Sequence, residues 1–409
     1  MSERMMIIGA GEAGTAAALA LRDGGYVHDI ILTGAEQHAP YERPPLSKHV
    51  ITHEGDVSLP HISVAAKFAE LNIIHVQQAV VDINPATKTT RCATGRELTY
   101  TKLLIATGAN PRKLILPGAE HAAYLRTFSD ALALRAAFQP GRQVIVIGGG
   151  FIGLECAASA RQRGCNVTVV EAAPRILMRG VPPEIAAFIE ARHRSEGVSF
   201  HIGTGLHRIE AEGLKKVLVL QNGMRLEADI ILAGIGATPE VTLAGAAGLS
   251  LDNGICVNGE LQTSNPDIYA VGDCCSFPHP LYDNRRMRLE AWRNAQDQGR
   301  FVAGNMLGGH DTYSAVPWFW SDQYDMHLQV AGMGDGAAQT IARDVGDDAL
   351  LMFHVAADGR LLAASGVGPI RKIAKDVRLA EMLIAKRAAP EASKLADPDV
   401  KLKGLLKED

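Results

Sequence analysis

Hydrophobic and polar positions repeat one arrangement twice along this chain: a short apolar run, a glycine-rich turn, and then an alanine-rich stretch. The apolar run predicts a buried strand, and the stretch after the turn predicts a helix. Two such strand–turn–helix units predict an α/β protein with parallel sheets. The runs and their glycines are residues 5–8 with Gly9, Gly11 and Gly14, and residues 144–147 with Gly148, Gly150 and Gly153.

The spacing of these glycines is typical of a dinucleotide site. The first glycine allows a tight turn, the second lets the backbone approach a pyrophosphate, and the third lets the helix pack close to its strand. The helix N-terminus then faces the phosphates. One such motif is weak evidence, but two in one chain predict two Rossmann-like domains. An enzyme that holds two dinucleotides is expected to pass electrons between them.

Each unit leads to an acidic residue that distinguishes the two sites. The second strand of the first unit, residues 30–32, exits toward Glu36, which is the available carboxylate for the adenosine ribose of FAD. A solvated loop position is the alternative for Glu36. In the second unit, residues 167–170 end at Glu171. A carboxylate there binds the ribose 2′-hydroxyl and repels a 2′-phosphate, so it favours NADH, although Arg175 could weaken that preference.

Composition narrows the class of protein. A chain of 409 residues allows two to four domains, and its net charge of -4 does not suggest nucleic acid. The apolar run before Gly9 is too short for a signal peptide, and no run approaches the roughly 20 residues of a membrane span. We therefore expect a cytoplasmic protein that binds neither membranes nor nucleic acid.

The six cysteines indicate what the chain lacks. They form no C-x-x-C pair and no zinc-ligand spacing, so we expect no bound metal and no dithiol mechanism. Cys274 and Cys275 are adjacent, which suits neither an ordinary disulfide nor a redox pair. Cys156 and Cys165 fit buried structural thiols.

Four longer motifs carry a resemblance to a known family. The chain resembles the FAD-dependent, NADH-using ferredoxin reductases of bacterial oxygenase systems, most closely those that serve Rieske-type aromatic-ring hydroxylating dioxygenases. Rubredoxin and putidaredoxin reductases are related, within the glutathione-reductase-like flavoproteins. The resemblance covers essentially the whole chain. Its motifs are PYERPPLSK at 40–48, LIATG at 104–108, YAVGD at 269–273 and VPWFWSDQY at 316–324.

The resemblance implies a catalytic pair, Lys48 and Glu155. Prolines stiffen the loop before Lys48, and the family places this lysine beside the flavin, where a cation stabilises negative charge. Glu155 is expected on the first turn of the NADH-binding helix, pairing with Lys48 and orienting the nicotinamide for hydride transfer. The alternative for Glu155 is a glutamate that complements the helix dipole. Thiol-using relatives carry a reactive cysteine in this loop, whereas this chain has Ser47 and no cysteine nearby, which argues against a disulfide reductase and against a cysteine-based oxidase.

Further contacts with the cofactors follow from the same resemblance. Arg43 and Arg126 are expected to contact FAD, Asp273 to bind its ribityl or pyrophosphate hydroxyls, and Trp292 to offer its backbone N–H over the flavin ring. Trp318 and Trp320 are expected to be core residues or to border the flavin edge. In the family an acidic residue directly follows the glycine that ends the second strand, whereas here Ala35 precedes Glu36. The other expected cofactor contacts are Ala13, Val80, Thr107, Gly108, Ile152 and Gly236.

The chain passes from the first nucleotide-binding part to the second after Thr107 and Gly108, and it returns through residues 234–239. These two passages predict the domain order. Residues 1–111 form the first part of an FAD domain, 112–243 an NADH domain, and 244–315 the second part of the FAD domain. A C-terminal α+β domain covers 316–409, with a helix over 371–386 and a polar low-complexity tail after residue 390.

The resemblance also implies the partner. NADH would deliver a hydride to FAD, which releases single electrons. The chain has no iron–sulfur ligand set, so the acceptor is expected to be a separate, acidic Rieske-type [2Fe–2S] ferredoxin that feeds a terminal oxygenase in aromatic hydrocarbon catabolism. Alternatives are a reductase of a rubredoxin or of a cytochrome P450 ferredoxin, an NADH-sensing flavoprotein, and an oxidase. A monomer and a homodimer both stay open. Docking would use Arg285, Arg286, Arg288 and Arg293, or Arg371, Lys372, Lys375 and Arg378.

Overall fold

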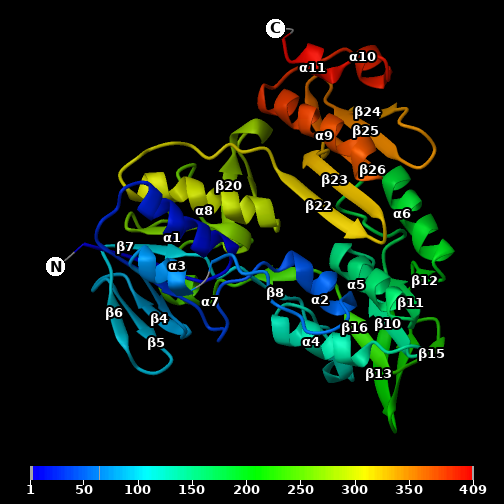
Figure 1. Ribbon diagram of the computed structural model, residues 1–409, viewed down its shortest axis with the longest axis horizontal. Helices are drawn as coiled ribbons and strands as arrows, with labels where there is room; N and C mark the ends of the chain where they lie inside the picture. The colour runs from blue at the N-terminus through cyan, green and yellow to red at the C-terminus, as the bar shows by residue number, and fades with distance from the viewer. Residues whose placement is uncertain (1–2, 64, 408–409) are drawn as a thin grey trace. The chain divides into compact units, whose positions relative to one another are not determined.

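The computed structural model describes residues 3–63 and 65–407 (Figure 1). Its contacts divide the chain into two compact units, each assembled from segments that are far apart in the sequence. Unit 1 comprises the described parts of 1–42, 59–110 and 238–317. Unit 2 comprises 43–58, 111–237 and the described part of 318–409. Strands β8 (Ala109–Pro111) and β17 (Ala237–Pro239) pair where the chain enters and leaves the long middle segment of unit 2.

A five-stranded parallel sheet forms the core of unit 1, in the order β19-β7-β1-β2-β3. Its strands are almost uniformly apolar because both faces are covered. Helices α1 and α8 pack side by side (Figure 1). They approach closely, since a Cβ at Gly299 of α8 would lie 2.3 Å from the carbonyl oxygen of Ala13 on α1. The elements are β1 (Arg4–Ile8), α1 (Glu12–Asp23), β2 (Asp29–Thr33), α3 (Ala65–Glu70), β3 (Ile73–Val76), β7 (Lys102–Ile105), β19 (Ile268–Ala270) and α8 (Trp292–Met306).

Two small sheets complete unit 1, one of them antiparallel in the order β4-β5-β6 and the other in the order β18-β20-β21. Their strands are β4 (Val80–Asn84), β5 (Thr89–Cys92), β6 (Glu97–Thr99), β18 (Ile255–Cys256), β20 (Cys275–His279) and β21 (Arg285–Met287). Short helices precede the strands of the second small sheet: α7 (Thr242–Ala246) comes before β18, η3 (Gly272–Cys274) before β20 and η4 (Pro280–Tyr282) before β21.

Unit 2 contains a second five-stranded parallel sheet, in the order β12-β11-β10-β16-β9. Buried valines of β10 and β11 pack against Cys156, Ala157 and Ala160 of α5, so small residues let this helix lie close to the sheet. The elements are η1 (Pro44–Ser47), α2 (His49–Thr52), η2 (Ala119–His121), β9 (Ala122–Ala123), α4 (Phe128–Ala137), β10 (Gln143–Ile147), α5 (Phe151–Gln162), β11 (Asn166–Glu171), α6 (Pro183–Ser195), β12 (Ser199–Ile202), β13 (Leu206–Glu212), β14 (Lys215–Leu220), β15 (Arg225–Ala228) and β16 (Ile230–Ala233).

The C-terminal part of unit 2 is an antiparallel sheet in the order β22-β23-β26-β25-β24, packed against α9 (Figure 1). The tail that we expected to be low-complexity instead folds into two short helices, because Leu395, Leu402 and Leu405 are buried. Buried Arg343 donates to four tail carbonyls, including those of Asp397 and Val400. The elements are β22 (Trp318–Gln323), β23 (Met326–Gly332), β24 (Gln339–Arg343), β25 (Leu350–Val355), β26 (Leu361–Gly368), α9 (Ile370–Ala385), α10 (Ala392–Ala396) and α11 (Leu402–Leu405).

The predicted fold class is confirmed, with two parallel dinucleotide-type sheets and an α+β C-terminal part. The predicted strands at 5–8 and 144–147 are β1 and β10, and the helix predicted over 371–386 is α9. Within the described residues, no helix combines the length and hydropathy needed to cross a bilayer. The division at 111, 243 and 315 stays a prediction.

Candidate functional site

The first glycine loop, in unit 1, has the geometry of a pyrophosphate cradle. Gly9 has φ +112°, and a Cβ there would lie 2.1 Å from the Ala106 carbonyl oxygen. A Cβ at Gly14 would lie 1.9 Å from the Gly9 carbonyl oxygen, so both positions require glycine. A Cβ at Gly11 would meet no atom of the described residues within 4 Å, which leaves this face open. The first N–H groups of α1 follow directly, so the loop fits a bound dinucleotide phosphate.

Glu12 occupies the first turn of α1 and was missed by the sequence reasoning. Gln296 of α8 donates to its Oε1 at 2.9 Å, while Oε2 is buried without a partner among the described residues. Burial raises the pKa of Glu12. A raised pKa favours the neutral form of the carboxyl group, and a neutral group suits a position beside an anionic pyrophosphate. The acidic residue inside the glycine motif was the available signal.

The carboxyl ends of adjacent parallel strands gather most of the predicted FAD residues of unit 1. β1, β7 and β19 are neighbours, so Gly9, Thr107 and Asp273 follow strands that end at one edge of the sheet. Gly272 donates to Gln298 Oε1 at 2.7 Å, and Gln298 Nε2 is a buried donor with no partner in the described chain. An unsatisfied donor here fits a polar ligand.

The remaining predicted residues of unit 1 lie as follows. Glu36 comes after β2 and accepts a hydrogen bond from the Tyr41 hydroxyl. Gly108, with φ +74°, continues the same edge after Thr107, whose hydroxyl donates to the Glu240 carbonyl at 2.7 Å. Trp292 opens α8, where its backbone N–H is one of the first-turn donors. Ala13 packs against Gly299, and Val80 begins β4 of the separate antiparallel sheet.

The second glycine loop, in unit 2, repeats the cradle. Gly148 has φ +101°, and a Cβ at Gly153 would lie 2.2 Å from the Gly148 carbonyl oxygen. The nearest atom to a Cβ at Gly150 would be 3.9 Å away, so its face is open. Gly236, with φ +102°, follows β16 at the same edge, and Ile152 on α5 is 48% exposed. This loop also fits a dinucleotide phosphate.

Glu171 ends β11 beside this loop, and both of its oxygens are held by backbone groups. Gly149 donates to one carboxylate oxygen and Ala173 to the other, each at 2.7 Å. The Arg175 guanidinium instead donates to the carbonyls of residues 176, 177, 178 and 181. Arg175 is therefore committed to its own loop, which removes the reason to expect it at a 2′-phosphate.

The predicted Lys48–Glu155 ion pair is present in unit 2. Lys48 Nζ lies 2.8 Å from Glu155 Oε2, and the Ser47 hydroxyl donates to the same oxygen at 2.5 Å. Ser159 on α5 donates to the Ser47 carbonyl at 2.7 Å, so α5 fixes the proline-rich loop at two points. Glu155 is 3% exposed and Lys48 23%. The expected place of Glu155 on the first helical turn was wrong, because α5 begins at Phe151; the helix-dipole alternative is therefore disfavoured.

Arg43 and Arg126 meet beside the proline-rich loop, since Arg43 Nη1 donates to the Arg126 carbonyl at 2.7 Å.

In the C-terminal sheet, the rings of Trp318 and Trp320 stack with centroids 5.5 Å apart. No cluster of metal-ligating side chains occurs in residues 3–63 and 65–407.

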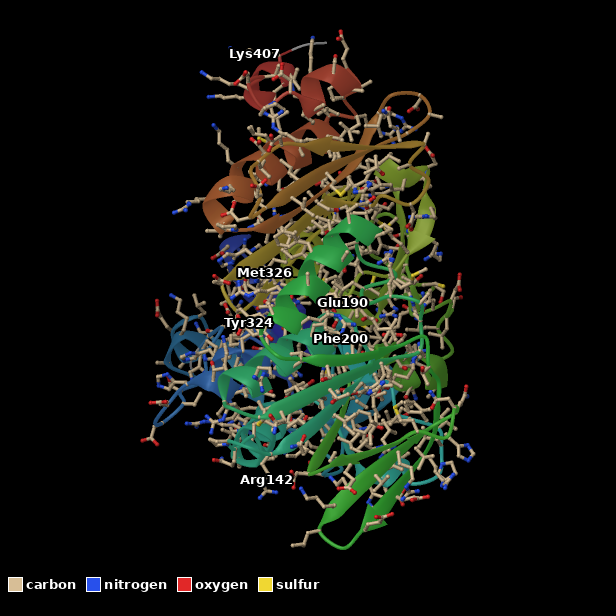
Figure 2. All side chains as sticks on the ribbon, turned by 90° about the vertical axis from the view of Figure 1, so that its right-hand side faces the viewer. Arg142, Glu190, Phe200, Tyr324, Met326 and Lys407 are labelled. Atoms are coloured by element: carbon tan, nitrogen blue, oxygen red, sulfur yellow. The ribbon has the colours of Figure 1, made fainter. Side chains whose placement is uncertain are left out.

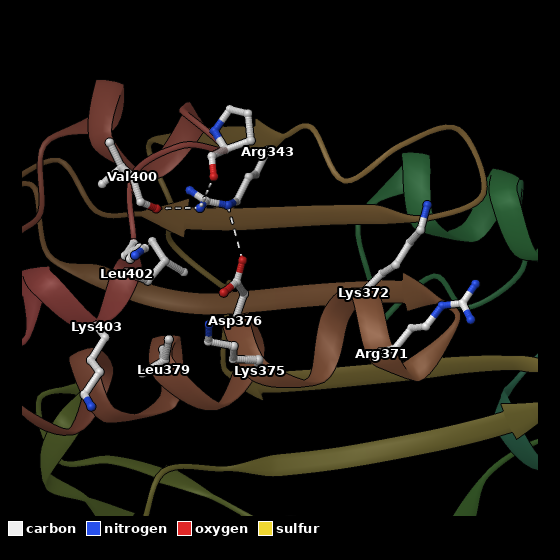
Figure 3. A pocket seen from close by; sticks show the side chains of 11 residues that line it. Arg343, Arg371, Lys372, Lys375, Asp376, Leu379, Val400, Leu402 and Lys403 are labelled. Atoms are coloured by element: carbon white, nitrogen blue, oxygen red, sulfur yellow. Dashed lines mark hydrogen bonds and ion pairs between the residues drawn. The ribbon is translucent and has the colours of Figure 1, made fainter.

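Both basic clusters contain cations that are already bound within the fold. In the first, Arg286 donates to two carbonyls and Arg288 to the Asp273 carbonyl and to Glu290. In the second, Lys372 pairs with Asp348 and Arg378 with Glu381. Arg371, Lys372 and Lys375 of the second cluster border a cavity of about 340 Å³ (Figure 3). Its charged lining residues are Arg343, Arg371, Lys372, Lys375, Asp376, Lys401 and Lys403.

Known proteins share this architecture. Residues 3–299 match the pyridine nucleotide-disulphide oxidoreductase model, and residues 318–406 match the reductase C-terminal model. The chain is 38% identical to the anthranilate 1,2-dioxygenase system ferredoxin–NAD(+) reductase component of Burkholderia cepacia, covering 99% of this chain and 100% of the relative.

Two solved structures agree with that assignment. The ferredoxin reductase of the CYP199A2 system from Rhodopseudomonas palustris has a TM-score of 0.93 and 36% identity, covering 98% of this chain and 99% of that one. Putidaredoxin reductase, in its covalent complex with putidaredoxin, has a TM-score of 0.92 and 35% identity, covering 99% of this chain and 98% of that one. The resemblance drawn from the motifs is confirmed, and the chain belongs to the pyridine nucleotide-disulphide oxidoreductase family.

Proposed function

We propose that this protein is an NADH-dependent, FAD-containing reductase of a [2Fe–2S] ferredoxin in a ring-hydroxylating dioxygenase system. The observation that carries the proposal is the Lys48–Glu155 pair. Ser47 donates to Glu155, and Ser159, on the helix of the second glycine loop, donates to the Ser47 carbonyl. The full-length similarity to a dioxygenase reductase component supports the choice of partner. We also propose a cytoplasmic location and the domain boundaries at 111, 243 and 315.

The residues divide the work as follows. The first glycine loop, with Asp273 at the same sheet edge, would hold FAD, and the second loop, with Glu171, would hold NADH. A bound FAD would supply a group that can take an electron pair from NADH and pass single electrons on to a separate acceptor. Lys48 supplies a fixed positive charge, and Glu155 holds that charge in place.

The burial of the cysteine thiols favours an electron acceptor that is a separate protein. Burial raises the pKa of Cys156, Cys274 and Cys275 and keeps these side chains protonated. Buried, protonated thiols are poor nucleophiles, so an internal dithiol relay is disfavoured and a separate redox protein fits better.

The function is tested by following NADH oxidation with and without a Rieske-type ferredoxin, with NADPH in parallel. We expect rapid ferredoxin reduction with NADH and slow reduction with NADPH. A P450-type ferredoxin and a rubredoxin serve as competing acceptors, because the Rhodopseudomonas relative belongs to a P450 system. Faster transfer to either competitor would replace the dioxygenase assignment. Flavin reduction with no transfer to any of the three would contradict the reductase function.

Charge reversal decides between the two docking clusters. We expect Arg371→Glu/Lys375→Glu to lower kcat/KM for ferredoxin about tenfold at low salt, because these two cations border the cavity and an acidic partner would lose its attraction. The matched variant Arg285→Glu/Arg293→Glu should change it less than twofold. The difference should fade at high salt. If the matched variant has the larger effect, ferredoxin docks on the first cluster.

A further inference from the structure

Glu155 is the end of a longer buried chain of hydrogen bonds within unit 2. Ser321 on β22 donates to Glu155 Oε1 at 2.6 Å, and Gln323 Nε2 donates to Ser321 Oγ at 3.0 Å. Gln323 Oε1 lies 2.7 Å from His193 Nε2, and the Tyr324 hydroxyl lies 3.2 Å from His193 Nδ1. Glu155, His193, Ser321 and Gln323 are all buried. The chain therefore links α5, β22 and α6 through buried groups and ends at Tyr324, which is half-buried.

The chemistry of the end group sets the direction of every bond. An ionised carboxylate only accepts, so Ser321 must donate to Glu155 and accept from the Gln323 amide. The Gln323 carbonyl then faces His193, which must carry its proton on Nε2. This leaves Nδ1 as the acceptor for Tyr324. Burial lowers the pKa of His193, which favours this neutral form.

We propose that Ser321, Gln323 and His193 are positioning residues that hold the Glu155 carboxylate in the orientation needed for its pairing with Lys48. Bonds that all point the same way polarise one another, so the donors strengthen the hold on the carboxylate together. The inference rests on the proposed function, because the reaction at this pair is taken to be NADH oxidation.

The hairpin between β22 and β23 shows that the far end of the chain is anchored. Tyr324 has φ +56°, a conformation that a bulky residue adopts only when its surroundings enforce it. Arg192 on α6 pairs with Asp325 at 2.6 Å and lies over the Tyr324 ring at 5.4 Å. Figure 2 shows Tyr324 and Met326 beside the helix that carries Glu190. Helix α6 thus fixes the segment that presents Gln323 and Ser321 to Glu155.

The test compares Ser321→Ala with Ser365→Ala. Ser365 is an equally buried serine of the same sheet that contacts a different histidine, His354. We expect Ser321→Ala to lower the rate constant of flavin reduction by NADH about fivefold to tenfold, with KM for NADH within twofold, since the lost bond to a charged group affects orientation rather than binding. Ser321→Thr, which keeps the hydroxyl, should restore most of the rate. Ser365→Ala should behave as wild type.

A second measurement does not depend on turnover. ¹⁵N NMR of histidine-labelled protein at pH 7.5 should show the His193 proton on Nε2, and the Gln323→Leu variant should lose that single tautomer. A proton on Nδ1 in the wild type, equal effects of the two serine variants, or a change in KM alone would overturn the proposal. Absence of NADH oxidation in the wild type would instead contradict the proposed function and leave the tautomer result standing.

Discussion

Lys48→Met is expected to lower the rate constant of flavin reduction by NADH by a factor on the order of 10² to 10³, because a preorganised charge at the reacting centre is among the larger catalytic contributions. Methionine keeps the length of the apolar stem and removes the ammonium group that lies 2.8 Å from Glu155. Stopped-flow absorbance of the flavin measures the rate directly. Ferredoxin docking does not enter this measurement, so the loss belongs to the NADH half-reaction.

The same variant should also destabilise the protein, and the double variant separates the two effects. Lys48→Met leaves Glu155, which is 3% exposed, as a buried charge without its ion-pair partner. Breaking a buried pair in this way costs about 3–5 kcal/mol, a figure that the partly exposed Lys48 reduces here. Adding Glu155→Gln removes the uncompensated charge and should restore much of the Tm, but it should not restore the rate. Recovery of both would mean that the pair is structural only.

Glu171→Ala is expected to lower kcat/KM for NADH by about 10- to 100-fold, because a hydrogen bond to a charged group is lost. The ratio of kcat/KM for NADPH to kcat/KM for NADH should rise by a larger factor, because the repulsion of the 2′-phosphate is also lost. The carboxylate lies at the end of β11 beside the second glycine loop, where it would accept from the ribose and repel a 2′-phosphate. Steady-state kinetics with both coenzymes give the ratio.

Two controls separate coenzyme selection from loop distortion. Glu171 also accepts hydrogen bonds from the backbone of Gly149 and Ala173, so its loss could distort the loop. Such a distortion would lower kcat/KM for NADH and for NADPH equally and leave their ratio unchanged. That outcome would remove Glu171 as the selecting residue. Arg175→Ala should lower Tm and leave the ratio unchanged, because this guanidinium is bound to the carbonyls of its own loop.

Local patterns predicted what depends on local geometry. The last glycine of each loop is required by a contact within the loop itself, Gly14 with the Gly9 carbonyl and Gly153 with the Gly148 carbonyl, so the spacing of the glycines was enough to predict both turns. The Lys48–Glu155 pair came from family resemblance, since nothing in the sequence brings positions 48 and 155 together. The hydrogen-bond chain from Ser321 to His193 was missed, although the WSDQY motif was noted. The motif residues bond to partners that lie 130 or more residues away, and the motif was interpreted through its tryptophans alone.

Other misses also arise from contacts that a local sequence pattern does not show. The polarity of the tail suggested a low-complexity segment, but three leucines and the carbonyls that receive Arg343 fold it onto the sheet. Arg286 and Arg288 read as a charged surface, whereas the structure uses both guanidinium groups for backbone carbonyls. Charge in a sequence does not say whether the charged group is already bound within the fold.

The order of strands in unit 1 has a consequence for synthesis on the ribosome. β19 (Ile268–Ala270) pairs with β7 (Lys102–Ile105), and the intervening chain includes the whole parallel sheet of unit 2. Until residue 270 has emerged, β7 presents an unpaired edge of buried-type residues, and closing this long loop carries an entropic penalty that slows folding. The nascent chain is therefore most exposed to aggregation in the interval between these two strands, when a chaperone that covers apolar edges would help most.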